Sequence, residues 1–570
     1  MNVEELWSDA VRDAARALWG AEIPGPALEP PSDPRFGDAA TSVPLRLARS
    51  LKRPPRELAE ALAAELRRRG LPGLARVEAA GAGFVNLAAS AEFYHGELRR
   101  ILEEGPRYGR SALGGGRRVL VEHCSANPTG PLHIAHGRQA AVGDSLANIL
   151  DFAGFRVTRE FYVNDTGNQI EMLGRSLLWR LTDAPEPPDP NCYRGDYVKA
   201  LARELAAQGG PVDLERAKRF GKDRLLEDIR RDLEAFRVRY DVWTSEEALH
   251  KSGKVEEVLN FFESWGLTYR KDGAVYLKTS EYGDTEDRPI VKTDGSYVYR
   301  LPDMAYHRDK FQRGFDILVD LWGPDHHAHI ATMRAGLKML NFNLVAPDQV
   351  RPSPSDTPET RPVAFEVLIV QHCRLLEGGR EIKMSKRAAS YVTLRELLDE
   401  VGVDAARFFF VMRKASSPLD FDLDVARRQS LDNPVYYAQY AHARIGSIYR
   451  KGIEEGKVDP ADLRDGLWAG RFDPARIGPD EIELLKTARA FRRRVELAAR
   501  DLDPAVIADF LRELSGAFQR YYEYGNRDAS RRVLHDDEEV RRARLAASAA
   551  VQQVLRNGFG LLGLSAPERM

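Results

Sequence analysis

The spacing of apolar and polar positions changes twice along the chain and divides it into three parts. Between about residues 106 and 430, short apolar runs typical of buried strands alternate with stretches whose apolar residues recur at helical spacing. This alternation predicts a parallel sheet covered by helices. A charged, helix-like stretch from about 175 to 285 separates early runs from late ones, so we interpret it as an insertion into the sheet domain. The runs comprise residues 118–122, 161–163, 317–319 and 365–370.

The two flanking parts have different patterns. Residues 1 to about 105 combine helix-like stretches with Pro-rich turns and a strand-like run at 83–87, which indicates a small N-terminal α/β domain. After Asn433 and Pro434 the strand signals stop, and amphipathic helical spacing continues to the end. We therefore predict an all-α domain over residues 431–570 and assign the fold as α/β with this helical domain attached.

Composition narrows the function classes. Of the 570 residues, 84 are Lys or Arg and 86 are Asp or Glu, so the net charge of -2 excludes a globally basic surface for nucleic acid. No apolar run has membrane-spanning length and no basic, apolar leader is present, so we expect no membrane association and a cytoplasmic location. The wide separation of Cys124, Cys192 and Cys373 excludes a Cys-x-x-Cys zinc site and argues against a disulfide framework.

Two histidines lie where a predicted strand gives way to a helix. His133 and His136 follow the strand at 118–122 and precede the helical spacing of residues 139–150. Free backbone N–H groups and the positive helix end at such a junction bind phosphates. Imidazoles there can donate hydrogen bonds to an α-phosphate as its negative charge grows during attack. The alternative is a helix cap or a half-buried surface pair.

Two lysines on a Gly-led loop form the second motif. Gly378 and Gly379 precede the loop, and its lysine ammonium groups suit a leaving pyrophosphate. Taken alone, a Lys-x-x-Lys spacing is usually a solvated face, whereas its occurrence after the histidine pair points to adenylate chemistry on a nucleoside triphosphate. The motif consists of Lys383, Met384, Ser385 and Lys386.

In this order, the two motifs resemble the signature of the class I aminoacyl-tRNA synthetases, which implies a Rossmann-like catalytic domain. Longer runs resemble the bacterial arginyl-tRNA synthetases over nearly the whole chain. Their activity is the ATP-dependent activation of L-arginine to arginyl-adenylate and its transfer to the 3′ end of tRNA(Arg), with AMP and pyrophosphate as products. The matching runs are residues 121–133, 161–170, 322–327, 403–409, 421–424 and 433–445.

The resemblance implies an arginine pocket at Glu122, Asn127, Tyr299 and Asp303. A permanently charged guanidinium with five donors needs carboxylates placed for forked hydrogen bonds. The alternative is that Glu122 and Asp303 pair with arginines of the protein. A synthetase for cysteine or glutamate would need a zinc-bound thiolate set or a basic pocket, which these carboxylates do not fit. A catalytically silent RNA-binding relative would not need the histidines and lysines.

The same resemblance assigns ATP to the two motifs and to a Gly-x-Asp pattern. His133, His136, Lys383 and Lys386 are the implied catalytic residues, and Mg²⁺ accompanies the triphosphate. Two positions depart from the family pattern: Ala135 replaces a glycine between the histidines, and Pro302 precedes Asp303. No metal site is predicted at the neighbouring His326, His327 and His329, since no carboxylate-flanked tetrahedral set is apparent. The remaining implied ATP contacts are Ala135, Gly137, Gly323, Asp325, Met384 and Ser385.

The implied partner is tRNA(Arg), bound before arginine is activated. The helical domain would read the anticodon, and the N-terminal domain would contact the tRNA elbow through Phe84 and Asn86. A half-buried strand is the alternative for these two residues. We expect the protein to be a monomer.

Overall fold

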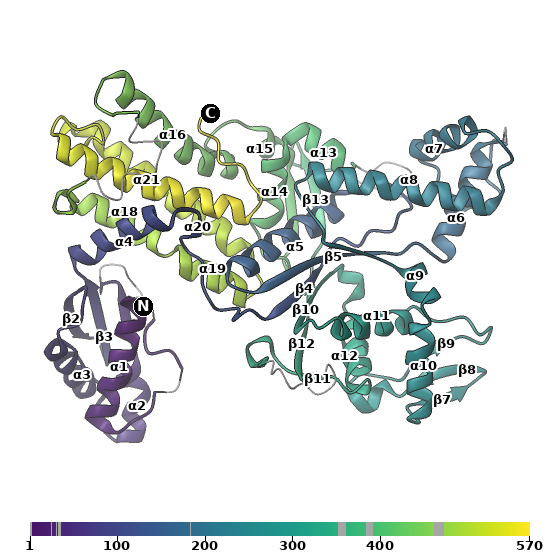
Figure 1. Ribbon diagram of the computed structural model, residues 1–570, viewed down its shortest axis with the longest axis horizontal. Helices are drawn as coiled ribbons and strands as arrows, with labels where there is room; N and C mark the ends of the chain where they lie inside the picture. The colour runs from purple at the N-terminus through teal and green to yellow at the C-terminus, as the bar shows by residue number, and fades with distance from the viewer. Residues whose placement is uncertain are drawn as a thin grey trace.

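The computed structural model describes residues 3–23, 25–29, 31, 33, 36–182, 184–351, 361–382, 392–460 and 472–570, with the side chains of residues 3–5 left out. A six-stranded sheet forms its centre (Figure 1). The strand order is β11-β12-β10-β4-β5-β6, and all neighbouring strands are parallel. Strands β5 and β6 lie on one side of β4, and β12 and β11 lie beyond β10 on the other, so the switch point of the topology lies between β4 and β10. The strands are β4 (Arg118–Glu122), β5 (Arg156–Val163), β6 (Val242–Ser245), β10 (Ile317–Trp322), β11 (Asn343–Leu344) and β12 (Pro362–Ile369).

Alternate residues of the central strands face two separate hydrophobic layers. Val119 and Val121 of β4 belong to a core shared with α5 (Ile134–Phe152), α13 (Leu394–Val401) and α14 (Val403–Val411). Leu120 faces the other core, beneath α10, α11 and α12. The predicted parallel sheet with helices on its faces is confirmed (Figure 1). The three helices of the second layer are α10 (Lys254–Ser264), α11 (Arg300–Gln312) and α12 (His329–Met339).

The segment predicted as one insertion, about residues 175–285, contains strand β6 of the main sheet. Before β6, three helices form an arm with its own small core. After β6, the chain forms α9, α10 and a three-stranded antiparallel sheet. The chain therefore leaves the main sheet after β5, returns to it to form β6, and leaves it again after β6. The elements are α6 (Asn168–Arg180), α7 (Asp196–Ala207), α8 (Leu214–Ala235), α9 (Glu246–Lys251), β7 (Thr268–Lys271), β8 (Ala274–Leu277) and β9 (Arg288–Val291).

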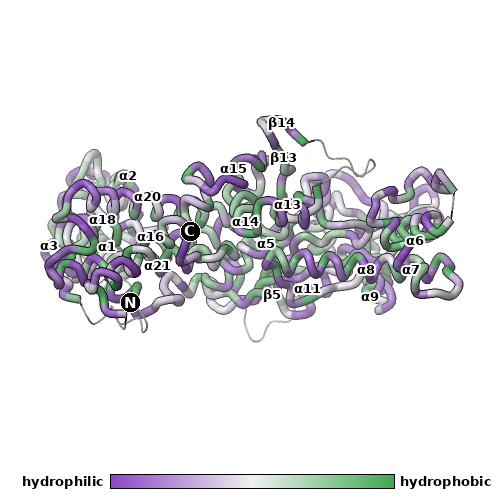
Figure 2. The backbone as a smooth tube through the Cα atoms, turned by 90° about the horizontal axis from the view of Figure 1, so that it is seen from above, coloured by the Kyte–Doolittle hydropathy of each residue, from purple (hydrophilic) through white to green (hydrophobic). Residues whose placement is uncertain are grey.

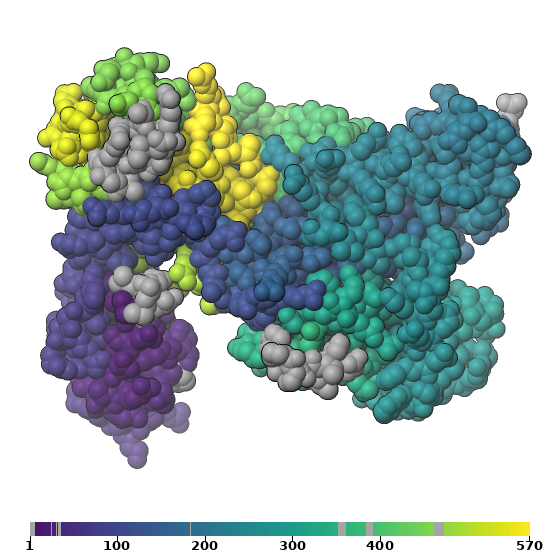
Figure 3. All heavy atoms as spheres, viewed as in Figure 1, coloured from purple at the N-terminus to yellow at the C-terminus, as the bar shows by residue number. Residues whose placement is uncertain are grey.

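The N-terminal part is a small α/β domain, as predicted. Three antiparallel strands in the order β1-β3-β2 pack with three helices around a separate core. Helix α4 (Ala91–Glu104) leads from this domain into contact with the C-terminal helices. Figure 3 shows the surface hollowed between the N-terminal domain and the sheet domain. The elements are α1 (Val3–Trp19), β1 (Ala39–Thr41), α2 (Val43–Leu51), α3 (Pro55–Arg69), β2 (Leu74–Ala80) and β3 (Phe84–Ala89).

The C-terminal part is helical in its described residues, as predicted. It begins at α16 (Pro434–Glu454), where the Asn433 side chain accepts a hydrogen bond from the Val435 N–H and Pro434 occupies the first helical position. Its hydrophobic core is continuous with the core above the six-stranded sheet. The two parts are therefore packed as one body. The later helices are α18 (Pro479–Arg489), α19 (Phe491–Arg500), α20 (Ala505–Arg527) and α21 (Glu538–Leu561).

A hairpin leads toward the lysine motif. Strands β13 (Cys373–Glu377) and β14 (Arg380–Glu381) are joined through Gly378 and Gly379, which have φ values of 56° and 71°. Two successive positive φ values match a tight hairpin turn that glycine adopts without strain. Figure 2 shows β14 projecting from the body. The remaining elements are β15 (Leu419–Asp422), α15 (Leu423–Arg427), η2 (Gly105–Arg107), η3 (Thr279–Tyr282), η4 (Pro324–His326), η5 (Pro347–Gln349), η7 (Pro474–Arg476) and η8 (Ala529–Arg531).

Candidate active site

The candidate site lies at the carboxyl ends of β4 and β10. Glu122 at the end of β4 is in register with Asp320 of β10, so the segments that follow both strands emerge at one edge. Cys124 and Ser125 then adopt positive φ values of 70° and 36°, a conformation that costs non-glycine residues energy and recurs at functional sites. This edge is the crevice in which open parallel sheets bind ligands.

The histidine pair lies at the start of α5. His133 is the residue that caps the helix, and its ring stacks on that of His136 with centroids 3.7 Å apart. The His133 N–H donates to Nδ1 of His136 at 3.4 Å. Ala135 is half-buried beside them. Both imidazoles therefore stand at a helix N-terminus, where an anion is favoured.

Gly137 has a packing role in this structure. A Cβ atom at this position would lie 2.8 Å from Leu394 Cδ1 and 3.1 Å from Phe410 Cε2. The absence of a side chain thus lets α5 approach α13 and α14 closely. The same contact fixes the end of α5 that carries the histidines.

The four residues of the lysine motif, Lys383 to Lys386, lie outside the described residues, but both ends of that stretch are anchored. On the entry side, the Ile382 N–H donates to the Leu375 carbonyl at 2.9 Å. On the exit side, Thr393 forms an antiparallel bridge with His133, and the Leu394 N–H donates to the Leu132 carbonyl at 2.8 Å. The chain that leaves the lysine motif therefore returns beside the histidine pair.

A cavity of about 130 Å³ adjoins the same edge, with carboxylates on its walls. Asp303 projects from the first turn of α11, and its Oδ2 lies 2.9 Å from His329 Nε2. Pro302 precedes it within that turn, where a backbone N–H has no helical partner to lose. The departure at Pro302 is thus accommodated by the helix start. The cavity is lined by Glu122, Tyr162, Asp303, Tyr306, His307, Trp322, His326 and His329.

Glu122 is fixed by two partners. Ser125 Oγ donates to Oε1 at 2.9 Å and Lys310 Nζ donates to Oε2 at 2.6 Å. Burial raises the pKa of Glu122, and the Lys310 charge opposes that rise. The alternative that Glu122 and Asp303 pair with arginines is not seen among the described residues, where their charged or basic partners are Lys310 and His329. Each carboxylate oxygen has a second lone pair for a ligand.

The sequence did not single out Glu246, the first residue of α9, as part of this site. Burial and the like charge of Asp303 raise its pKa to about 7, while a hydrogen bond from Tyr162, a residue that lines the cavity, opposes the rise. Glu122 and Asp303 line the cavity, Glu246 lies close to Asp303, and the described residues that line the cavity include no lysine or arginine. This excess of negative charge favours a cationic ligand.

The other predicted contacts lie around this edge with differing exposure. Asn127 donates from Nδ2 to Gln169 Oε1 at 2.8 Å. Tyr299 is 54% exposed at the start of α11, with its ring centroid 5.3 Å from that of His329. Gly323 directly follows β10, and a Cβ there would lie 2.6 Å from Asp325 Oδ1. The Asp325 carboxylate is exposed and lies 3.4 Å from His326 Nε2.

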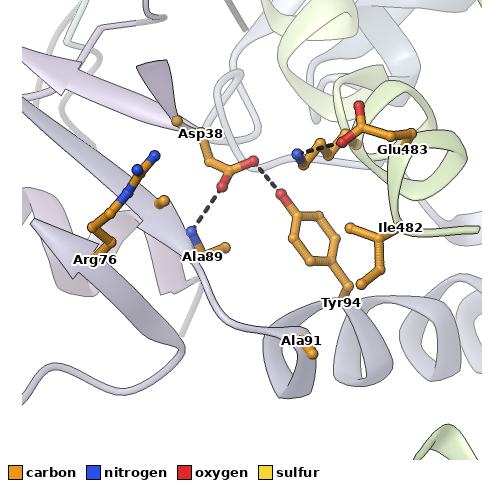
Figure 4. A pocket seen from close by; sticks show the side chains of 10 residues that line it. Asp38, Arg76, Ala89, Ala91, Tyr94, Ile482 and Glu483 are labelled. Atoms are coloured by element: carbon orange, nitrogen blue, oxygen red, sulfur yellow. Dashed lines mark hydrogen bonds and ion pairs between the residues drawn. The ribbon is translucent and has the colours of Figure 1, made fainter. Parts of the chain in front are cut away.

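The candidate tRNA contacts lie on the outer face of the N-terminal sheet. Phe84 is 39% exposed and Asn86 is half-buried on β3, while Val85 between them is buried in the core. Ala88 continues this face into a cavity of about 410 Å³ between the sheet and α18. Figure 4 shows this cavity, where the Asp38 carboxylate accepts hydrogen bonds from the Ala89 N–H and the Tyr94 hydroxyl. Cations at its walls are Arg76 and Lys486.

Among the residues that the structure describes, no helix is both long and apolar enough to cross a bilayer. Within that same part of the chain, no three His, Cys, Asp or Glu side chains are grouped to hold a metal ion.

Comparison with known proteins identifies three family domains along the chain. Residues 5–89 match the arginyl tRNA synthetase N terminal domain, and residues 438–570 match the DALR anticodon binding domain. Residues 97–184 and 200–353 match the catalytic domain of class I (R) tRNA synthetases. These matches follow the order of the N-terminal domain, the sheet domain and the helical domain.

Individual relatives match along their whole length. The chain is 43% identical to an arginine–tRNA ligase of Syntrophotalea carbinolica, over 97% of this chain and 96% of that one. It is 39% identical to that of Bacillus subtilis over 100% of both chains. The arginyl-tRNA synthetase structure of Thermus thermophilus, 22% identical, superposes over 100% of both chains with a TM-score of 0.74, which supports the fold. The chain therefore belongs to the arginyl-tRNA synthetase family.

Proposed function

We propose that this arginine–tRNA ligase binds its amino acid in the cavity between β4, β10 and α11, next to the histidine pair. The observation that carries the assignment is the pair of carboxylates, Glu122 and Asp303, on a cavity wall whose described lining residues include no lysine or arginine. Glu246 adds a third acid close to Asp303. A guanidinium supplies the missing positive charge and the planar donors that carboxylates bind in forked pairs. Asn127 and Tyr299, at the rim, would contact the remainder of the amino acid.

ATP would bind across the same edge. His133 and His136 would donate to the α-phosphate as the arginine carboxylate attacks it, and Lys383 and Lys386 would stabilise the departing pyrophosphate. Ala135, Gly137, Gly323, Asp325, Met384 and Ser385 complete the proposed nucleotide site. The anchoring of Thr393 beside His133 supports the proximity of the two motifs. The terminal ribose hydroxyl of the tRNA would then attack the activated carbonyl carbon.

Mg²⁺ would enter with ATP. Phosphate oxygens and water are the ligands that Mg²⁺ prefers in nucleotide sites, and the ion would neutralise charge on the triphosphate. Since the described residues contain no metal-binding group of three, we assign no protein ligands to it.

We propose three functional units with limits near residues 105 and 430. Residues 1–105 would contact the tRNA elbow through Phe84 and Asn86, whose sheet face is continuous with the basic side chains at the wall of the larger cavity. Residues 431–570 would read the anticodon. We further propose that the protein acts as a monomer in the cytoplasm. The hollow between the N-terminal and sheet domains supports the proposal that RNA binds between them (Figure 3).

The proposed function is tested by ATP–pyrophosphate exchange with each of the standard amino acids, with and without tRNA. We expect exchange with arginine alone, and only when tRNA is present. Exchange with another amino acid would contradict the proposed specificity for arginine. Exchange with arginine in the absence of tRNA would contradict the requirement for bound tRNA.

The ionisation of Glu246 predicts how arginine binding depends on pH. With a pKa of about 7, this carboxylate is mostly charged at pH 8 and mostly neutral at pH 6. Arginine attracts the charged form, so we expect the KM for arginine to rise as the pH falls from 8 to 6, by up to about tenfold for one charge-assisted hydrogen bond. In Glu246→Gln this pH dependence should be absent.

The matched control is Glu247→Gln on the same helix. Glu247 forms ion pairs with Lys222 and Lys251, which hold the pKa of its carboxyl at about 2. Its substitution should leave the wild-type pH profile of the arginine KM unchanged. An unaltered profile in Glu246→Gln would remove Glu246 from the site.

A further inference from the structure

Three buried carboxylates form a row across the central sheet. The strand register pairs Asp320 of β10 with Glu122 of β4, and Glu122 with Glu160 of β5. Residues in register on parallel strands project to the same face, and here that face is covered by α11. Glu122 is 8% exposed, and Asp320 and Glu160 are fully buried. Such a row requires compensating positive charge.

Helix α11 and the residue that ends it supply a matching row of bases. His307, Lys310 and Arg313 are three residues apart, which places them on one side of the helix. His307 Nε2 lies 2.6 Å from Asp320 Oδ2. Arg313 donates to both oxygens of Glu160 at 2.8 and 3.0 Å. Lys310, in the middle, serves two acids, with Nζ 2.6 Å from Glu122 Oε2 and 3.0 Å from Asp320 Oδ1.

Glu122 alone among the three acids lines the smaller cavity. Lys310 is fully buried and is absent from the cavity wall, with its ammonium 4.3 Å from the centre of the Tyr306 ring. Although burial opposes it, the charges of Asp320, Glu122 and Glu160 raise the pKa of Lys310. The charged Lys310 ammonium is therefore hydrogen-bonded to Glu122, the one carboxylate of the row that is accessible to a ligand in the cavity.

We propose that Lys310 is a positioning residue for arginine, which acts through Glu122 by fixing the orientation of its carboxylate and keeping it ionised beside the cavity. This inference rests on the proposed arginine site. Without the Lys310 charge, the buried Glu122 carboxylate would take up a proton and offer a neutral acid to the guanidinium. Asp303 and Lys310 both lie on α11. This helix would therefore supply Asp303, which contacts arginine directly, and Lys310, which positions Glu122.

The test is a double-mutant cycle of Lys310→Met and Glu122→Gln in the full-length enzyme. Methionine keeps the length of the side chain and removes the ammonium. We expect Lys310→Met to raise the KM for arginine by about tenfold or more, the loss of one charge-assisted contact, with a much smaller change in the KM for ATP. In the Glu122→Gln background the same substitution should leave the arginine KM unchanged within about twofold.

A control and a second comparison make the test decisive. Lys254→Met removes a lysine paired with Asp309, away from the cavity, and should not change the arginine KM. If Lys310→Met does not fold, the double variant, which removes the Glu122 charge with that of Lys310 and leaves Asp320 with His307, is compared with Glu122→Gln alone. Equal arginine KM values in that pair support the inference, whereas a further rise in the double variant overturns it.

The outcomes separate this inference from the assignment of the site. If Glu122→Gln raises the arginine KM and Lys310→Met alone leaves it unchanged, the site stands and the role of Lys310 is wrong. If Glu122→Gln itself leaves the arginine KM unchanged, the proposed place of Glu122 in the arginine site fails first, and the role of Lys310 fails with it.

Discussion

Asp303→Asn is expected to weaken arginine binding by about 1.5–3 kcal/mol, or roughly ten- to a hundredfold in the arginine KM. Asparagine preserves the shape of the side chain but replaces a charged acceptor by a neutral one, so a charge-assisted hydrogen bond to the guanidinium is lost. Because Asp303 lines the cavity and holds His329 at 2.9 Å, the substitution acts within the proposed site. The KM for ATP should change little. Steady-state exchange kinetics measure both constants.

The control for this prediction is Asp309→Asn, the same chemical change six residues later on α11. Asp309 forms ion pairs with Lys254 and Arg313 and does not line the cavity. Its arginine KM should match that of the wild type. Equal arginine KM values for the Asp303 variant and the wild type would place the guanidinium elsewhere.

Arg407→Leu is expected to lower the free energy of unfolding by about 3–5 kcal/mol, a large part of the stability of a typical domain. Arg407 is fully buried on α14. It donates to Asp144 Oδ2 at 2.6 Å, to the Leu562 carbonyl at 2.8 Å and to the Phe236 carbonyl at 3.0 Å. Leucine would leave a buried carboxylate and two buried carbonyls without this donor. Arg159 Nε, 3.7 Å from Asp144, would compensate only in part.

Urea denaturation followed by circular dichroism measures this loss. Arg374→Leu is the control, since Arg374 pairs with Asp420 on the surface, where both side chains are about half exposed. A surface pair contributes about 0–1 kcal/mol. Similar stability losses in the two variants would show that the Arg407 contacts do not hold the helices together.

The sequence predicted those parts of the fold whose signals are local. The apolar run at 118–122 corresponds to β4, and the helix expected after the histidines is α5. Asn433 and Pro434 mark the start of α16 because a capping side chain and a proline at the first helical position are both properties of adjacent residues. The two motifs of the class could be recognised because each is a short run with fixed spacing.

The features that the sequence did not predict depend on contacts across the fold. Glu246 follows Ser245, which caps α9, so locally it is an ordinary acid in a first helical turn. Its place beside Asp303 arises because β6, four residues within a charged and helical segment, joins the main sheet. Lys310 likewise resembles a surface lysine until the register of β4 and β10 brings two carboxylates to its ammonium. Periodicity does not encode strand register between distant segments.

The contacts of Arg407 with the end of the chain bear on the order in which the protein folds during its synthesis. Domains generally form as they emerge from the ribosome, beginning at the N-terminus. Here the carbonyl of Leu562 and the segment beyond it contact α14, and Arg237 just after α8, only once residues 562–565 have been made. The main sheet can form earlier, but Arg407 then lacks an acceptor that lies 155 residues later in the chain. This buried junction is therefore completed well after the sheet on which it packs.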